Sequence, residues 1–126
     1  MATQDRRGRR HARLTFKEAV NEQITALHDV DILDLSIGGA RIEHTALLRP
    51  GATCRLRVPL QNRSVTLLCH VVWSRAVGRA EGSRGDTGLL FHSGLEFGTM
   101  APDVKAFLTA YLDAQGIPEK DGSPTE

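Results

Sequence analysis

The sequence is poor in aromatic residues, cysteine, long apolar runs and net charge, and each shortage excludes a class of protein. Aromatic residues make up 5% of the 126 residues, which argues against a sheet that binds nucleic acid by stacking bases on rings. Two cysteines do not make a disulfide framework. No apolar run approaches the roughly 20 residues that cross a bilayer, and the polar start of the chain is unlike a signal peptide. We therefore expect one soluble, cytoplasmic domain without membrane insertion.

The small net charge of +1 conceals an uneven distribution of 16 basic and 15 acidic residues. Five arginines and one aspartate lie within residues 1–13, so this segment carries a net charge of +4. The remainder of the chain carries −3. A cationic segment beside an anionic body is typical of a protein with an anionic partner, although a solvated tail has the same composition.

Short apolar or alternating runs separated by turn residues predict β-structure through most of the chain. We expect strands at 20–27, 30–35, 40–43, 53–58 and 65–77, with a final pair of segments at 88–91 and 94–97. The glycine-rich stretch 78–86 predicts a loop.

Both cysteines lie on the apolar faces of two strands that form a predicted hairpin. If residues 61–64 make its turn, Leu56 faces Cys69 and Cys54 faces Val71. The cysteines are then diagonal neighbours, and we expect two buried thiols rather than a disulfide bond.

The end of the chain changes to helical periodicity. Apolar residues recur on one helical face at Val104, Phe107, Leu108, Tyr111 and Leu112. The prediction is a small antiparallel barrel of about six strands, with the C-terminal helix covering its open end. We expect a flexible basic arm over 1–13, the barrel and helix over 14–115, and a frayed tail over 116–126.

The arm ends in Arg9-Arg10-His11-Ala12-Arg13, an R-x-x-x-R motif with an additional arginine inside it. A guanidinium group presents a planar fork of donors that matches phosphate oxygens and the O6 and N7 edge of guanine. It also stacks on purine rings. Arg6 and Arg10 satisfy the same spacing.

A second motif, D-x-S-x-x-G, follows at the end of a predicted strand with Asp34, Ser36 and Gly39. The Asp34 carboxylate suits the N1–H and N2–H₂ edge of guanine, or an arginine that it holds in place, and Gly39 lets a backbone approach a ligand closely. Asp and Ser also build ordinary turns. Because about one strand and its connection separate the motifs, the arm can fold back onto this turn. Together they favour a ligand with two phosphates and two guanines.

The paired motifs, on a β-rich chain with a trailing helix, resemble the PilZ domain family of bacterial cyclic di-GMP receptors. The resemblance covers roughly residues 5–112 and implies a split six-stranded antiparallel β-barrel, mainly β, with a C-terminal α-helix. It favours Arg9 and Arg13 over Arg6 and Arg10, because residues 14–16 resemble the family's entry to its first strand. In some relatives the ligand binds as an intercalated dimer, so the number of ligands stays open.

The resemblance implies a set of contacts to cyclic di-GMP, which is a ligand rather than a cofactor. The binding residues are Arg9, Arg10, Arg13, Asp34, Ser36, Gly38 and Gly39, with Arg6, His11 and Trp73 as further candidate contacts. By strand alternation Trp73 faces the core, unless a bulge rotates it. The histidines lack the spacing of a metal site, and no nucleophile elbow is present, so we expect neither a metal nor an enzyme.

The predicted function is a cyclic di-GMP receptor that orders its arm and signals to a downstream protein effector in motility, polysaccharide or biofilm regulation. We expect a monomer or weak dimer that binds neither DNA nor RNA. Two alternatives remain open: a small basic-armed barrel that binds nucleic acid, and a PilZ-like interaction module that binds no ligand.

Overall fold

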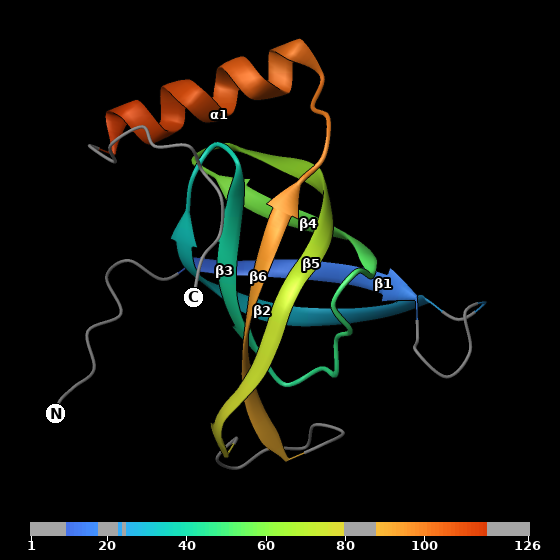
Figure 1. Ribbon diagram of the computed structural model, residues 1–126. Coiled ribbons are helices and arrows are strands. Elements are labelled where there is room, and N and C mark those ends of the chain that lie inside the picture. The colour runs from blue at the N-terminus through green and yellow to red at the C-terminus, as the bar shows by residue number, and fades with distance from the viewer. Residues whose placement is uncertain (1–9, 18–22, 24, 80–87, 116–126) are drawn as a thin grey trace, which may run out of the picture.

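The computed structural model describes residues 10–17, 23, 25–79 and 88–115 of the chain. Its six strands form a closed antiparallel barrel in the order β1-β2-β3-β6-β5-β4, and one helix lies across an end of the barrel (Figure 1). This confirms the predicted fold class. The elements are β1 (Arg10–Lys17), β2 (Thr25–Leu35), β3 (Gly39–His44), β4 (Thr53–Leu60), β5 (Arg63–Arg79), β6 (Leu89–Phe97) and α1 (Pro102–Ala114).

Strict alternation of apolar and polar residues explains why the strands curl into a barrel with a dry interior. In β4 every second side chain is buried, and Leu56, Val58 and Leu60 are completely inaccessible to solvent. Fully burying one such side chain contributes about 1.5–3 kcal/mol. The intervening arginines of β4 point outward, so one face of the strand builds the core and the other builds the surface.

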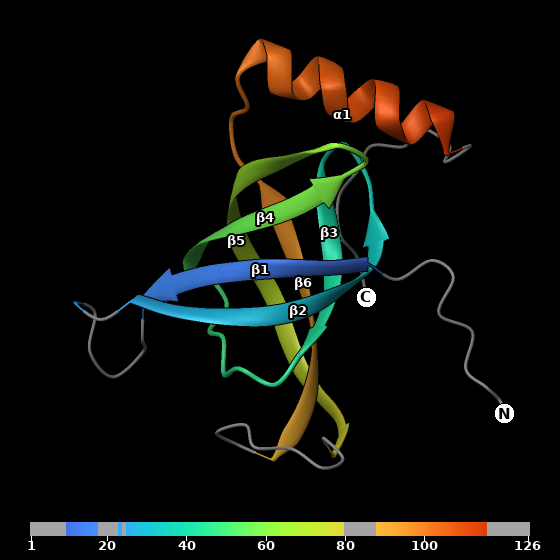
Figure 2. The ribbon, with the colours of Figure 1, turned by 180° about the vertical axis from the view of Figure 1, so that it is seen from behind.

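Helix α1 closes one end of this interior, as predicted. Leu108, Tyr111 and Leu112 are buried in the core cluster, and Pro102 occupies the first turn, where its missing N–H leaves no hydrogen bond unmade. The helix ends at Ala114. Figure 2 shows the same helix above β4 and β1 from behind. Within the described residues, no helix has the length and apolar character needed to span a membrane.

The N-terminal part of the barrel differs from the prediction. Residues 10–13, assigned to the flexible arm, belong to β1, because Ala12, Leu14 and Phe16 alternate with outward polar side chains and are buried. The predicted break at 28–29, between a strand over 20–27 and another over 30–35, is wrong, since 25–35 is one continuous strand. Residues 18–22 and 24 lie outside the described residues, as do the rest of the predicted arm, the predicted tail and the stretch 80–87.

Two further boundaries are corrected at the other end of the barrel. The segments predicted at 88–91 and 94–97 form one strand, β6, which begins at residue 89 and pairs with β5 along its length and with β3 over 91–96. Residues 78 and 79 belong to β5 instead of the predicted loop. Ladder pairing on both sides of β6 keeps it continuous through Gly94, a residue that weakens an isolated strand.

The predicted register of the β4–β5 hairpin is wrong by two residues. The turn contains only Gln61 and Asn62, because Leu60 pairs directly with Arg63. Gln61 has a φ of 56°, the left-handed conformation that the first residue of a tight hairpin turn requires. The shorter turn shifts the ladder, and Cys54 therefore faces Cys69 directly.

The two facing cysteines are buried and present as free thiols. The Cys69 thiol donates a hydrogen bond to the carbonyl oxygen of Leu67, with 3.3 Å between sulfur and oxygen. The hydrogen bond with Cys54 and burial both raise the pKa of the Cys69 thiol. Protonated, uncharged thiols of this kind behave as small apolar groups in a core.

Candidate ligand-binding site

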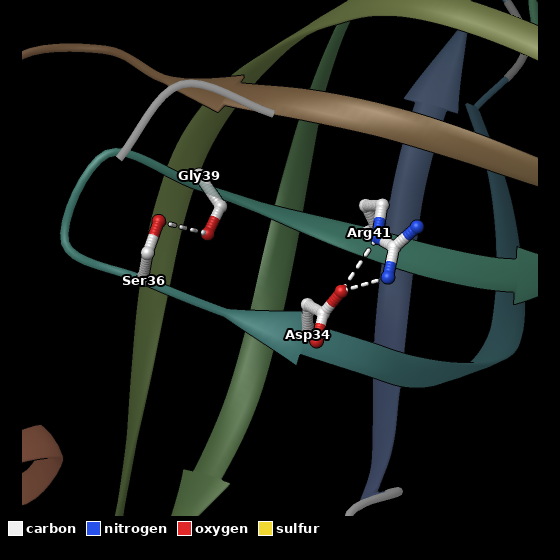
Figure 3. Close-up of polar contacts among 4 residues, drawn as sticks. All are labelled: Asp34, Ser36, Gly39 and Arg41. Atoms are coloured by element: carbon white, nitrogen blue, oxygen red, sulfur yellow. Dashed lines mark hydrogen bonds and ion pairs between the residues drawn. The ribbon is translucent and has the colours of Figure 1, made fainter. Parts of the chain in front are cut away.

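The turn between β2 and β3 carries the D-x-S-x-x-G residues on the wall of the barrel, and backbone hydrogen bonds fix its shape. The backbone N–H of Ser36 donates to the carbonyl oxygen of Gly39 at 2.9 Å, and the Ser36 hydroxyl donates to the same oxygen at 3.2 Å (Figure 3). On the other side, the Phe97 N–H donates to the carbonyl oxygen of Gly38 at 2.8 Å. The turn is thus held by its own serine and by β6.

A bulge in β2 places Asp34 on the outer face of the barrel. The ladder between β2 and β3 shifts between Ile32 and Asp34, so that Asp34 lies opposite Arg41. Without the extra residue at position 33, Asp34 would follow the buried Ile32 by simple alternation and point into the barrel. The Arg41 guanidinium donates to one carboxylate oxygen of Asp34 from Nε, at 2.6 Å, and from a terminal nitrogen (Figure 3).

Arg41 is a site residue that the sequence reasoning missed. It lies two residues beyond Gly39 in the following strand. Side chains two residues apart in a strand share a face, and this spacing was the one indication that Arg41 lies on the same face as the turn. Its contact with Asp34 depends on the register of the β2–β3 hairpin, which the β2 bulge sets. The sequence alone allowed Asp34 to hold an arginine, and the structure identifies that arginine as Arg41.

Trp73 extends this site along the outer face. Gly94 pairs with Arg41 on one side and with Trp73 on the other, so these residues form one row across the sheet. A bulge between Val71 and Trp73 turns the indole outward, and the core position expected from simple alternation is wrong. The indole lies over Gly94, where an added Cβ would lie 2.4 Å from the indole Nε1.

The arginines at the start of β1 lie at different distances from the turn. Arg10 pairs with Ile32, two residues before Asp34 along β2, and its guanidinium carbon lies 5.1 Å from the centre of the Tyr111 ring. Arg13 pairs with Asp29, five residues from Asp34, or about 16 Å along a strand. Its Nε lies 2.9 Å from the Asp29 carboxylate.

The structure therefore brings together only part of the predicted site. Asp34, Ser36, Gly38 and Gly39 share one turn, and Trp73 lies in the same outer row. Arg13 is separate from them, and Arg6 and Arg9 lie outside the described residues.

Two acidic side chains of the β2–β3 hairpin, Asp31 and Glu43, each lie beside a histidine. His11 Nδ1 lies 2.8 Å from the Asp31 carboxylate, and His92 Nε2 lies 3.0 Å from the Glu43 carboxylate. Asp31 and Glu43 are themselves paired across β2 and β3. Within the described part of the chain, no group of three or more His, Cys, Asp or Glu side chains is arranged to hold a metal ion.

A closed barrel with a helix over one end and a fixed polar turn on its wall defines a small binding domain. The family model for the PilZ domain matches residues 4–114, and the chain belongs to the PilZ domain family. PilZ is a cyclic di-GMP-binding fold. None of the curated proteins matches the chain.

Two solved structures are similar to the model. One is the PilZ domain with cyclic di-GMP of YcgR from Escherichia coli, with 15% identity, a TM-score of 0.58, and coverage of 89% of this chain and 93% of that one. The other is the PilZ domain of CeSA from a cellulose-synthesizing bacterium, with 13% identity, a TM-score of 0.49, and coverage of 85% and 97%. The similarity to the YcgR domain agrees with the barrel topology described above.

Proposed function

We propose that this chain is a receptor that binds cyclic di-GMP at the β2–β3 turn and closes its basic N-terminal segment over the ligand. The observation that carries this proposal is the outward Asp34 beside a serine-braced turn, next to the start of β1, in a chain that the PilZ model matches over 4–114. Strand β1 begins at Arg10, which pairs with Ile32, two residues before Asp34 along β2.

Each group at the turn has a function suited to a guanine nucleotide. The Asp34 carboxylate accepts from the N1–H and N2–H₂ edge of one guanine, and the two hydrogen bonds from Arg41 orient that carboxylate. The outward Trp73 indole offers a flat apolar surface against which a base stacks. Gly38 and Gly39 add no side chain to the turn at which the ligand would lie.

The arginines bind the remaining parts of the ligand. Strand β1 begins at Arg10, two ladder positions from Asp34, so we assign its sequence neighbour Arg9 to the phosphates or the guanine that lies at the turn. Arg13 lies about 16 Å along the sheet from Asp34 and its side chain is exposed. Arg13 and Asp34 therefore bind different parts of the ligand, or different ligands of an intercalated pair.

Signalling follows from a change in order of the N-terminal segment. Arg6, Arg7 and Arg9 precede β1 and repel one another without an anion, and a bound diphosphate neutralises them and orders the segment that holds them. A downstream protein effector then meets a different surface. The free energy available to that effector is limited by the ligand's preference for the ordered state.

The test is calorimetric titration of the full chain with cyclic di-GMP, GTP and single-stranded DNA. We expect cyclic di-GMP to bind with a dissociation constant on the order of micromolar or tighter, and Arg9→Ala, Arg13→Ala and Asp34→Ala each to weaken binding by about 1.5–3 kcal/mol. Arg79→Ala is the matched control, because Arg79 is an exposed arginine opposite Leu89, at the other end of β5. Stoichiometry gives the number of ligands.

Each other outcome points to a different conclusion. An effect of Arg6→Ala without one of Arg13→Ala would move the R-x-x-x-R motif to Arg6 and Arg10. Binding of single-stranded DNA in place of cyclic di-GMP would favour the nucleic-acid alternative. Binding of neither would leave a PilZ-like interaction module.

A further inference from the structure

A groove of about 580 Å³ opens at the end of β1 that lies away from the β2–β3 turn. The ladder between β1 and β4 ends at Phe16 and Cys54, and beyond this pair the two strands separate. The loop that precedes β4 forms the other wall, with Leu47 and Arg49. We call this feature the β1–β4 groove, and it is lined chiefly by Phe16, Lys17, Leu47, Arg49, Arg55 and Leu68.

The walls of the β1–β4 groove include two large apolar side chains that the fold leaves in contact with solvent. Leu47 is 58% exposed and Leu68 is 42% exposed. Leu68 points outward from β5 opposite Arg55, so it contributes little to the core. Apolar side chains gathered in a concave, polar-rimmed depression are typical of an interaction site.

The charged side chains of the groove all have the same sign. Lys17, Arg49 and Arg55 line it, and no acidic residue does so among the described part of the chain. The outer face continues this charge, because Arg57 lies directly opposite Arg13 across β1 and β4. The cationic lining of the groove itself therefore favours an anionic partner.

We propose that the β1–β4 groove docks a short acidic peptide segment of a partner protein, with an apolar side chain between Leu47 and Leu68. Carboxylates of the segment pair with Lys17, Arg49 and Arg55. A peptide fits better than an anionic membrane, because the leucines line a concave groove, whereas insertion into lipid needs protruding apolar side chains. This inference adds a partner surface to the proposed receptor, since β1 connects the two sites, but peptide docking itself does not require the ligand.

The test selects a random peptide library displayed on phage against the full chain, with and without cyclic di-GMP. Selected sequences should combine several Asp or Glu residues with a Leu, Phe or Trp. Synthetic copies of them should bind the wild-type chain at least about tenfold more tightly than they bind Arg55→Glu or Leu68→Asp. Binding should weaken as salt rises, because ions screen the exposed charges.

Matched controls separate docking at the groove from general charge effects. Val77→Asp and Arg79→Glu make the same changes on exposed positions of β5 outside the groove, and they should leave peptide affinity unchanged. Thermal unfolding of each variant confirms that it folds. Peptides without acidic residues, or equal affinity for the groove variants, would overturn the proposal.

Two further measurements exclude other occupants. Wild-type chain that binds phosphatidylglycerol vesicles but no peptide would show a membrane site instead. A concentration-dependent dimer that Leu68→Asp abolishes in sedimentation would show a second copy of the chain in the groove. If the wild-type chain binds cyclic di-GMP but no acidic peptide, the docking proposal is rejected and the receptor proposal stands. If it binds the peptide but not cyclic di-GMP, the receptor proposal is rejected and the docking proposal stands.

Discussion

Asp34 and Arg41 face one another across the β2–β3 hairpin, and the carboxylate accepts two hydrogen bonds from the guanidinium. Both side chains are partly exposed on the outer wall of the barrel. The pair therefore adds little to folding stability, since exposed ion pairs contribute about 0–1 kcal/mol. Its main consequence is to hold a charged acceptor at a defined position beside the Ser36–Gly39 turn.

The first prediction separates binding from stability at this pair. Arg41→Gln should weaken cyclic di-GMP binding by about 1.5–3 kcal/mol, because the carboxylate of Asp34 loses its orienting partner and the site loses a cation. The same change should alter the free energy of unfolding by less than about 1 kcal/mol. Calorimetry and urea unfolding measure the two effects, and Arg41→Lys should recover part of the binding. A large loss of stability with unchanged affinity would assign Arg41 a structural function.

The second prediction concerns the glycine beneath the tryptophan. An alanine at position 94 would place its Cβ 2.4 Å from the Trp73 Nε1 and 2.6 Å from Cε2, so Gly94→Ala must displace the indole. We expect a loss of about 1–3 kcal/mol in unfolding free energy and a red shift of tryptophan fluorescence. Gly78→Ala is the matched control, because no atom lies within 4 Å of its added Cβ. An unshifted spectrum in Gly94→Ala would contradict the outward packing of Trp73.

The third prediction is a pH dependence that originates from His44. Nε2 of this buried side chain lies 2.6 Å from the hydroxyl oxygen of Ser93. The Ser93 hydroxyl in turn donates to the Ser74 hydroxyl at 2.8 Å. Burial separates the imidazole from water, and its Nδ1 has no hydrogen-bond partner. Burial lowers the pKa of His44 from 6.5 to about 4.

The unfolded chain therefore binds this proton more readily than the folded chain between about pH 6.5 and 4. The contribution of His44 to stability is complete above the unfolded pKa and falls as the pH drops toward the folded pKa. We expect the free energy of unfolding to fall by about 1 kcal/mol between pH 7.5 and 5.5. The full effect of His44, reached well below its folded pKa, is about 3 kcal/mol. Urea unfolding at these pH values measures it. His44→Gln should remove the slope, while the exposed His70→Gln should keep it, and an unchanged slope in His44→Gln would refute the assignment.

The fourth prediction concerns the facing thiols. Both Cys54 and Cys69 are buried, with at most 2% of either side chain exposed, and the raised pKa of Cys69 disfavours its reactive thiolate. Ellman's reagent should therefore modify the native chain slowly and modify two thiols at once in urea. Cys54→Ala should reduce that number to one. Rapid reaction of one thiol in the native chain would show that the barrel opens at the β4–β5 pair.

The alternation of apolar and polar residues predicted most of the barrel, because β4, β5 and the helix each carry a clear periodicity. It failed at the first strand, where basic side chains on the outer face of β1 resembled a solvated arm. There the pairing of Arg13 with Asp29 and the burial of Leu14 decide the structure. When the outward residues of a strand are mostly charged, its sequence resembles that of a solvated tail, and alternation alone does not identify the strand.

Register was likewise undetermined by sequence. The facing cysteines depend on whether the hairpin turn has two residues or four, and both choices keep the apolar face of each strand inward. The two-residue turn matches the twist of the strands, and Gln61 adopts the left-handed conformation that this turn requires. Only the folded ladder fixes that choice.

The sequence by itself determined the fold class, the D-x-S-x-x-G turn and the position of the cationic segment, because these depend on local periodicity and short motifs. Tertiary structure alone decided that Asp34 contacts Arg41, that Trp73 points outward and that Arg13 lies apart from the turn. The physical reason is that each bulge reverses which face the following side chains occupy: there is one in β2, between Ile32 and Asp34, and there are two in β5, between Val71 and Trp73 and between Ala76 and Gly78. Bulges arise from pairing between distant strands, which a single strand's sequence does not record.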